Sequence, residues 1–216
     1  MYLSKNLTHK DGPAHRFRRS AGPRQSGFTL IELMVTITVA AILITLAVPN
    51  FILLIQNNRI TSATNDFITV LNQARAEAVK RGNVVFICRT DDPQASPSDC
   101  QRANNAVYDG NWSKGWLMYS VPTTIIATEG DYVDGTDILV RLGTGPVGGV
   151  RITSDTEGNQ WLGYNSDGML FEASEARFAV CDDRDESAGR LIRIPLTGRP
   201  LVEDTTAVAG FGCSPT

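Results

Sequence analysis

The chain begins with a polar, basic stretch, continues with a long apolar run, and then shows apolar residues at helical spacing. The apolar run extends from Phe28 to Val48, 21 residues with one formal charge at Glu32. At about 1.5 Å per residue, a helix of this length spans roughly 31 Å, one bilayer core. The run therefore predicts a membrane-spanning helix with a single carboxylate near its start.

Beyond Pro49 the apolar residues lie three or four positions apart, which places them on one face of a helix: Ile60, Ala63, Phe67, Leu71, Ala74 and Ala78. Gly82 suits the C-terminal cap of this helix. The pattern predicts one helix from Phe28 to about Arg81, with residues 28–54 in lipid and residues 55–82 packed on a domain. Pro49 lacks a backbone donor and clashes with the preceding turn, so we expect a bend or local melting there.

After Gly82 the pattern changes to short runs of β-branched and aromatic residues, which are typical of strands. Six runs are predicted: Val84–Cys88, Trp116–Val121, Ile138–Leu142, Trp161–Tyr164, Arg177–Cys181 and Arg190–Ile194. Asn165–Gly168 carries a turn signal between two of them. Many short strands without a second long helix predict an α+β protein, in which residues 83–216 form an antiparallel β-domain packed on the helix.

The residues around Gly27 carry a second signal. This small residue comes before the apolar run, whereas an ordinary secretory signal has small residues after it. The segment GFTLIELMVTITVAAILITLAVPNF resembles the class III signal of type IV pilins and type II secretion pseudopilins. The resemblance implies that a prepilin peptidase removes residues 1–27, that the new Phe28 amine is methylated, and that Glu32 serves assembly by pairing with such an amine. The alternative is a plain single-pass anchor.

The composition argues against catalysis. Residues 1–27 contain six of the 20 Lys and Arg residues, one of the 23 acids and both histidines. The remaining 189 residues carry 14 basic and 22 acidic residues and no histidine. Because histidine is the commonest general base and metal ligand, we predict no catalytic site, no metal site and no cofactor. The carboxylates within residues 182–186 are interpreted as a solvated hairpin tip, with a calcium site as a remote alternative.

All four cysteines, Cys88, Cys100, Cys181 and Cys213, lie in the part that is expected to be exported. An even number of cysteines in an exported domain favours disulfides, and four cysteines allow three pairings. Sequence neighbours give the simplest pairing, Cys88–Cys100 and Cys181–Cys213. The chain-entropy relation assigns these two loops about 3 and about 4 kcal/mol as an upper guide.

Four segments of the soluble part resemble the FimT/FimU/GspH group of minor pilins: ARAEAVKR at 74–81, NWSKGW at 111–116, YNSDG at 164–168, and FAVC at 178–181 followed by Gly198-Arg199. The resemblance covers nearly all of residues 28–216 and implies a helix packed on a two-sheet β-domain. Trp112 and Trp116 of the second segment are also candidates for the core.

Members of this group have three roles. A FimU-like subunit joins other minor pilins in a complex that primes the type IV pilus, a FimT-like subunit binds DNA through a C-terminal Gly-Arg-x-Arg element, and a GspH-like subunit belongs to the type II secretion pseudopilus. Here the element reads Gly198-Arg199-Pro200-Leu201, and residues 164–216 hold nine acids against five arginines. Because phosphate contacts need local positive charge, DNA binding is disfavoured. The candidate DNA contacts are Arg190, Arg193 and Arg199.

We therefore predict a minor pilin that primes and caps the type IV pilus, with DNA uptake and type II secretion as the alternatives. The expected partners are the prepilin peptidase, other minor pilins, the major pilin, the inner-membrane assembly platform and the lipid bilayer. The expected location is the inner membrane, with a periplasmic C-terminal domain, and then the pilus tip.

Overall fold

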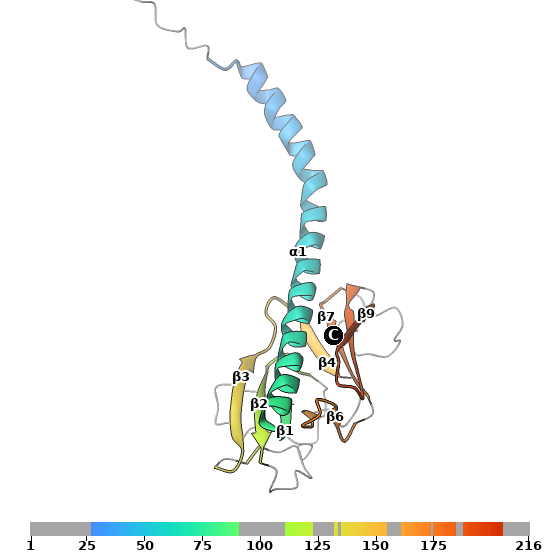
Figure 1. Ribbon diagram of the computed structural model, residues 1–216. Coiled ribbons are helices and arrows are strands. Elements are labelled where there is room, and N and C mark those ends of the chain that lie inside the picture. Colours follow the sequence, from blue (N-terminus) through green and yellow to red (C-terminus); the bar gives the residue numbers. More distant parts are fainter. Residues whose placement is uncertain are drawn as a thin grey trace, which may run out of the picture. The chain divides into compact units, whose positions relative to one another are not determined.

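The computed structural model describes residues 27–90, 111–122, 132–133, 135–154, 161–173, 175–184 and 188–204. The chain divides into two compact units, Met1–Ala47 and Val48–Thr216. Helix α1 (Leu30–Arg81) begins in the first unit and ends in the second (Figure 1). By length and composition it can cross a membrane, and its most apolar stretch has no buried residue among those described.

Helix α1 ends where the sequence predicts. Gly82 has a φ of 65°, and its N–H donates to the Ala78 carbonyl at 3.0 Å, as expected of a left-handed residue that closes a helix. Pro49 lies inside the helix, which continues without a break. The expected local melting is therefore absent, because the fixed φ of proline is itself compatible with a helix. A bend at Pro49 remains a prediction.

The described strands form two antiparallel sheets, which confirms the predicted fold class (Figure 1). The five-stranded sheet has the order β3-β2-β1-β5-β6, with β1 at Val84–Arg89, β2 at Gly115–Val121, β3 at Ile138–Thr144, β5 at Trp161–Tyr164 and β6 at Leu170–Phe171. The four-stranded sheet has the order β4-β7-β8-β9, with β4 at Arg151–Ser154, β7 at Glu175–Cys181, β8 at Arg190–Pro195 and β9 at Leu201–Asp204.

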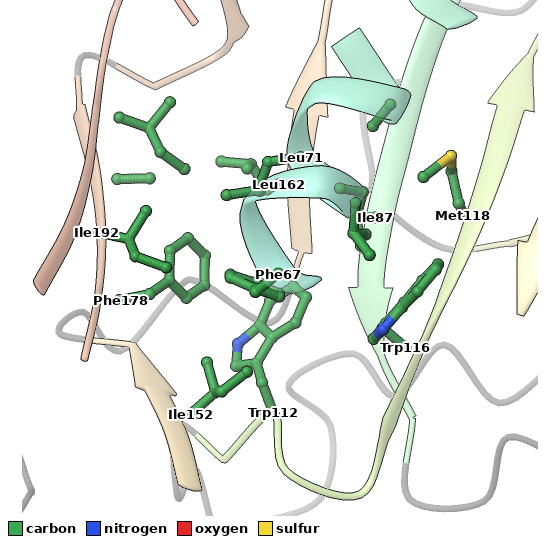
Figure 2. Close-up of a cluster of buried hydrophobic side chains, with 14 of the residues drawn as sticks. Phe67, Leu71, Ile87, Trp112, Trp116, Met118, Ile152, Leu162, Phe178 and Ile192 are labelled. Atoms are coloured by element: carbon green, nitrogen blue, oxygen red, sulfur yellow. The ribbon is translucent and has the colours of Figure 1, made fainter. Parts of the chain in front are cut away.

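The main core lies between the helix and the two sheets. All six residues of the predicted apolar stripe are buried. Phe67 lies 6.0 Å from Trp112 and 5.0 Å from Phe178 between ring centroids, both in edge-to-face geometry. Figure 2 shows Phe67 and Leu71 between side chains of the two sheets. The apolar stripe therefore joins three layers of the domain, and Trp112 and Trp116 both belong to this core.

The five-stranded sheet is buried on its second face as well. Phe86, Cys88, Leu117 and Tyr119 form a separate buried cluster on strands β1 and β2. The Phe86 ring stacks on the Tyr119 ring, with centroids 5.5 Å apart. Burial on both faces explains why these two strands read as continuous apolar runs and not as an alternating pattern.

The helix and both sheets also meet at two glycines. Arg75 Nε donates to the Gly168 carbonyl at 2.8 Å, and the Leu170 N–H donates to the Leu196 carbonyl at 3.0 Å. Gly198 has a φ of 72°, and a Cβ atom there would clash with the Gly168 carbonyl oxygen. The glycine of the Gly198-Arg199 element is therefore required by backbone packing.

Gly198→Ala is expected to destabilise the domain more than a glycine replacement that meets only backbone strain. The matched control is Gly135→Ala, because Gly135 has a φ of 79° and open space around it. We expect a loss of about 1–2 kcal/mol for the control from the left-handed conformation alone. Gly198→Ala should add about 1–3 kcal/mol from overpacking.

Urea unfolding of the fragment 55–216 measures both losses. Equal losses for the two variants would show that the close approach of Gly198 and Gly168 contributes nothing.

Candidate processing and assembly site

The residues predicted to flank the cleaved bond lie just ahead of the helix. Gly27, Phe28 and Thr29 are not helical and are exposed. The Glu32 N–H donates to Thr29 Oγ1 at 3.3 Å, and the Leu33 N–H donates to the Thr29 carbonyl at 3.1 Å. Thr29 is therefore the N-cap residue. The helix starts at Leu30 and not at Phe28 as predicted, because the Thr29 hydroxyl takes an N–H that a longer helix would bind.

Glu32 lies in the first turn of the helix, four residues after Phe28 in the sequence. A negative charge is favourable at this end of a helix, where unpaired N–H groups leave a partial positive charge. Among the described residues, no ion pair involves the Glu32 carboxylate. Sequence reasoning missed Thr29, although Thr29-x-x-Glu32 has the spacing of a capping box.

A polar network holds helix α1 to the domain just after the apolar run. Arg184, which follows β7, donates through Nη1 to Asn57 Oδ1 at 2.8 Å and pairs through Nη2 with Asp182 at 2.8 Å. On the other side, Arg59 Nη1 donates to the Gly148 carbonyl at 3.3 Å. Sequence reasoning missed these residues, because partners 89 and 127 positions apart carry no local signal.

Two acids of the predicted acidic tip, Asp182 and Asp183, lie in the described part of the chain. Of these two, only Asp182 is buried in the polar network. Burial raises the pKa of Asp182, but hydrogen bonds from Arg184 and its positive charge outweigh this effect and lower the pKa below its ordinary value. Asp183 stays exposed and lies 3.6 Å from Arg151. The interpretation as a solvated tip is thus wrong for Asp182, whose carboxylate is partnered inside the protein.

Cys88 on β1 and Cys181 on β7 are both disulfide-bonded. Cys100 and Cys213, their predicted partners, fall outside the described residues. The pairing Cys88–Cys100 and Cys181–Cys213 therefore remains a prediction. The two cysteines belong to different sheets, so each sheet has one covalent attachment point.

The three candidate DNA contacts do not share one face. Side chains alternate along a strand, so Arg190 and Arg193 project from opposite faces of β8. Arg193 Nε donates to Glu203 Oε1 at 2.8 Å, and its Nη1 lies 3.7 Å from Glu175. The hydrogen bond to Glu203, and secondarily that residue's charge, raise the pKa of Arg193. Arg199 is exposed, and no ion pair in the described part of the chain involves it.

An open groove of about 550 Å³ runs between helix α1 and the segment that follows β3. Phe67, Trp112 and Trp116 lie along it, with Asp66 and Arg141 as its charged lining residues. The Arg141 guanidinium lies 5.6 Å from the Trp116 ring centroid. This lining suits the packing of apolar groups.

An apolar helix with a capped, exposed N-terminal end, packed through its second half on a two-sheet domain, defines a pilin-like protein. Residues 22–48 match the prokaryotic N-terminal methylation motif. Residues 63–198 match the family described as type II transport protein GspH. The chain belongs to this family and is a minor pilin of the FimT/FimU/GspH group.

A solved structure gives the same fold. The type IV minor pilin FimU of Pseudomonas aeruginosa matches with a TM-score of 0.51 and 19% sequence identity, over 72% of this chain and 96% of that one. A second crystal form of FimU gives a TM-score of 0.48, also at 19% identity, over 71% and 98% of the two chains. No curated protein matches the sequence.

Asp182→Asn is expected to destabilise the soluble domain at neutral pH by about 1.5–3 kcal/mol, the usual range for a hydrogen bond to a charged group. Because the folded-state pKa of Asp182 is lowered from 3.8, its contribution is complete above the unfolded pKa and is lost as pH falls through the folded pKa. The stability difference between wild type and variant should therefore shrink below about pH 4.

Urea unfolding of the fragment 55–216 across this pH range measures the difference. Asp183→Asn is the control and should have little effect, since its carboxylate is 81% exposed and exposed ion pairs contribute little. A difference for Asp182→Asn that stays constant to pH 2 would contradict the assignment.

Proposed function

We propose that this chain is a minor pilin that joins other minor pilins to prime and cap the type IV pilus. The observation that carries the proposal is the division of helix α1. Its first part exposes apolar side chains that only lipid or neighbouring helices can cover, and its second part is buried in a compact domain. Such a chain suits transfer from a bilayer to a helical assembly. The likeness in fold to the minor pilin FimU supports this role.

The N-terminal end supplies the chemistry of maturation in this proposal. A prepilin peptidase cuts between Gly27 and Phe28, and the new Phe28 amine is methylated. The Glu32 carboxylate then pairs with the Phe28 amine of its own chain or of a neighbour. An unpaired carboxylate in hydrocarbon costs about 2.5–3.5 kcal/mol on insertion scales, so the pairing favours entry into the assembly. The inner-membrane assembly platform and the major pilin are the remaining partners.

DNA binding is disfavoured as the main activity. Arg193 is partnered by two carboxylates, Arg190 projects from the other face of β8, and Leu201 stands where DNA-uptake pilins have arginine. The segment after Gly27 also carries a net charge of −8 by residue count, which repels a polyanion at long range. On the hairpin formed by β8 and β9, only Arg199 is an exposed arginine among the described residues.

The second candidate is a minor pseudopilin of the type II secretion system. The description of the matching family favours this role. Both candidates share the maturation steps, so the assembly that fails when the gene is deleted separates them. Loss of pili with normal secretion would support the pilus role, and the reverse result would support the pseudopilus role.

Glu32→Gln is expected to leave processing largely intact and to reduce incorporation into the assembly strongly, because an amide cannot form an ion pair with the Phe28 amine. Mass spectrometry of membrane-extracted protein should show a methylated N-terminal Phe28 in both wild type and variant. Immunoblotting of sheared filaments measures incorporation.

The matched control is Glu77→Gln, which removes a partly buried carboxylate from the same helix. Glu77 pairs with Arg81 at 2.7 Å within the soluble domain, so its loss should not change incorporation. Normal incorporation of the Glu32→Gln variant would contradict the assembly role, and an N-terminus elsewhere than Phe28 would contradict the processing site.

The fragment 55–216 is expected to capture other minor pilins and to bind duplex DNA weakly at most near physiological salt. Titration with a labelled duplex tests the second expectation, with Arg199→Gln compared to Arg177→Gln as a control on β7. Micromolar or tighter binding that only Arg199→Gln abolishes would favour the DNA-uptake role over the tip complex.

A further inference from the structure

One hydroxyl group decides where helix α1 starts. The Glu32 N–H donates to Thr29 Oγ1 at 3.3 Å, and the Leu33 N–H donates to the Thr29 carbonyl at 3.1 Å. Gly27, Phe28 and Thr29 remain outside the helix and are not buried by the described protein. The bond between Gly27 and Phe28 therefore lies two residues ahead of the first helical residue.

The Thr29 hydroxyl takes the place of the Phe28 carbonyl as acceptor for the Glu32 N–H. Use of that carbonyl would extend the helix toward the peptide bond between Gly27 and Phe28. In an α-helix each N–H donates to the carbonyl four residues earlier, so without the hydroxyl the Glu32 N–H would take the Phe28 carbonyl. The same pattern then directs the Ile31 N–H to the Gly27 carbonyl, which belongs to the bond expected to be cut. In an apolar setting an unsatisfied N–H is costly, so loss of the hydroxyl favours this longer helix.

We propose that Thr29 is a positioning residue for prepilin processing. Its hydroxyl ends the helix at Leu30 and thereby keeps the bond between Gly27 and Phe28 in non-helical, accessible backbone. Hydrolysis adds water across this bond: the Gly27 carbonyl carbon gains the oxygen of the water and becomes a carboxylate, and the departing nitrogen takes both hydrogens of the water and becomes the protonated Phe28 amine. Attack requires access to the Gly27 carbonyl, which a helical turn would shield. The inference rests on the proposed cleavage between Gly27 and Phe28.

The sequence offers closely matched variants for the test. Thr29→Val keeps the side-chain shape and removes the hydroxyl, whereas Thr29→Ser keeps a capping hydroxyl. Thr36→Val is the control within the same helix, because the Thr36 hydroxyl donates to the Leu33 carbonyl at 2.8 Å and caps nothing. The full-length precursor is reconstituted in lipid vesicles with purified prepilin peptidase, and kcat/KM and the site of cleavage are measured.

We expect Thr29→Val to lower kcat/KM by about five-fold, the population change that corresponds to a typical N-cap. Thr29→Ser should restore the rate to within about two-fold of wild type, and Thr36→Val should leave it unchanged. A ¹³C label on the Gly27 carbonyl reports the cause. Its infrared band should move to the frequency of a helical carbonyl in Thr29→Val and stay non-helical in wild type and in Thr29→Ser.

Three outcomes would overturn the inference: cleavage of Thr29→Val at the wild-type rate, a Thr29→Ser variant as slow as Thr29→Val, or slow cleavage of Thr29→Val without the change at the Gly27 carbonyl. The last outcome would mean that the peptidase reads the side chain directly. Wild-type precursor that is not cut between Gly27 and Phe28 would instead overturn the proposed processing. The two failures are therefore distinguishable.

Discussion

The mutual packing of the Phe67, Trp112 and Phe178 rings, each in edge-to-face contact with the other two, holds the soluble domain together. The three rings come from the helix, from the segment before β2 and from strand β7. Trp112 is itself fixed by its backbone N–H, which donates to the Ile152 carbonyl of β4 at 2.8 Å. Truncating a buried aromatic residue to alanine typically costs about 3–5 kcal/mol, a large share of the stability of a single domain. The helix is thus the layer that both sheets need in order to bury their inner faces.

The same helix has two environments along its length, and its two ends are built differently. Its first part exposes residues such as Ile42 and Leu46 to more than 60%, whereas Leu71 and Ala74 are fully buried. A helix can pass through both environments because its backbone hydrogen bonds are internal. The N-terminal end is fixed by the side chain of Thr29 and the C-terminal end by the backbone of Gly82. Both ends can therefore be assigned without contacts from elsewhere in the chain.

The position of each charged side chain in the folded domain decides whether it is paired or free. Asp182 lies in a run of acids that reads as solvated, but Arg184 buries and binds its carboxylate and so connects the region after β7 to Asn57 of the helix. Arg193 lies in a hairpin that reads as a cationic candidate, but Glu203 and Glu175 occupy its guanidinium. The ion pair of Arg193 with Glu203 joins two neighbouring strands. Asp182 and Arg184 lie only two residues apart, and it is the hydrogen bond from Arg184 to Asn57 that reaches a distant segment. Counting charged residues in the sequence gives the sign of the net charge. It does not show whether a particular charged side chain is free to bind a partner.

The helix, its buried stripe, its C-terminal cap, six of the strands and the turn at residues 165–168 could all be predicted from the sequence, because each depends on residues close together in the chain. Strands β4, β6 and β9 were missed. They span only two to four residues, and β9 contains two acids, so their pairing with β7, β5 and β8 comes from the sheet and not from local propensity. Gly198 was read as part of a DNA-binding element, and only its approach to Gly168 reveals its structural role. Local hydrogen bonds and helical or strand periodicity depend on residues that are close together in the sequence. Contacts between segments 30 to 130 residues apart form only when the layers pack, so the sequence pattern does not reveal them.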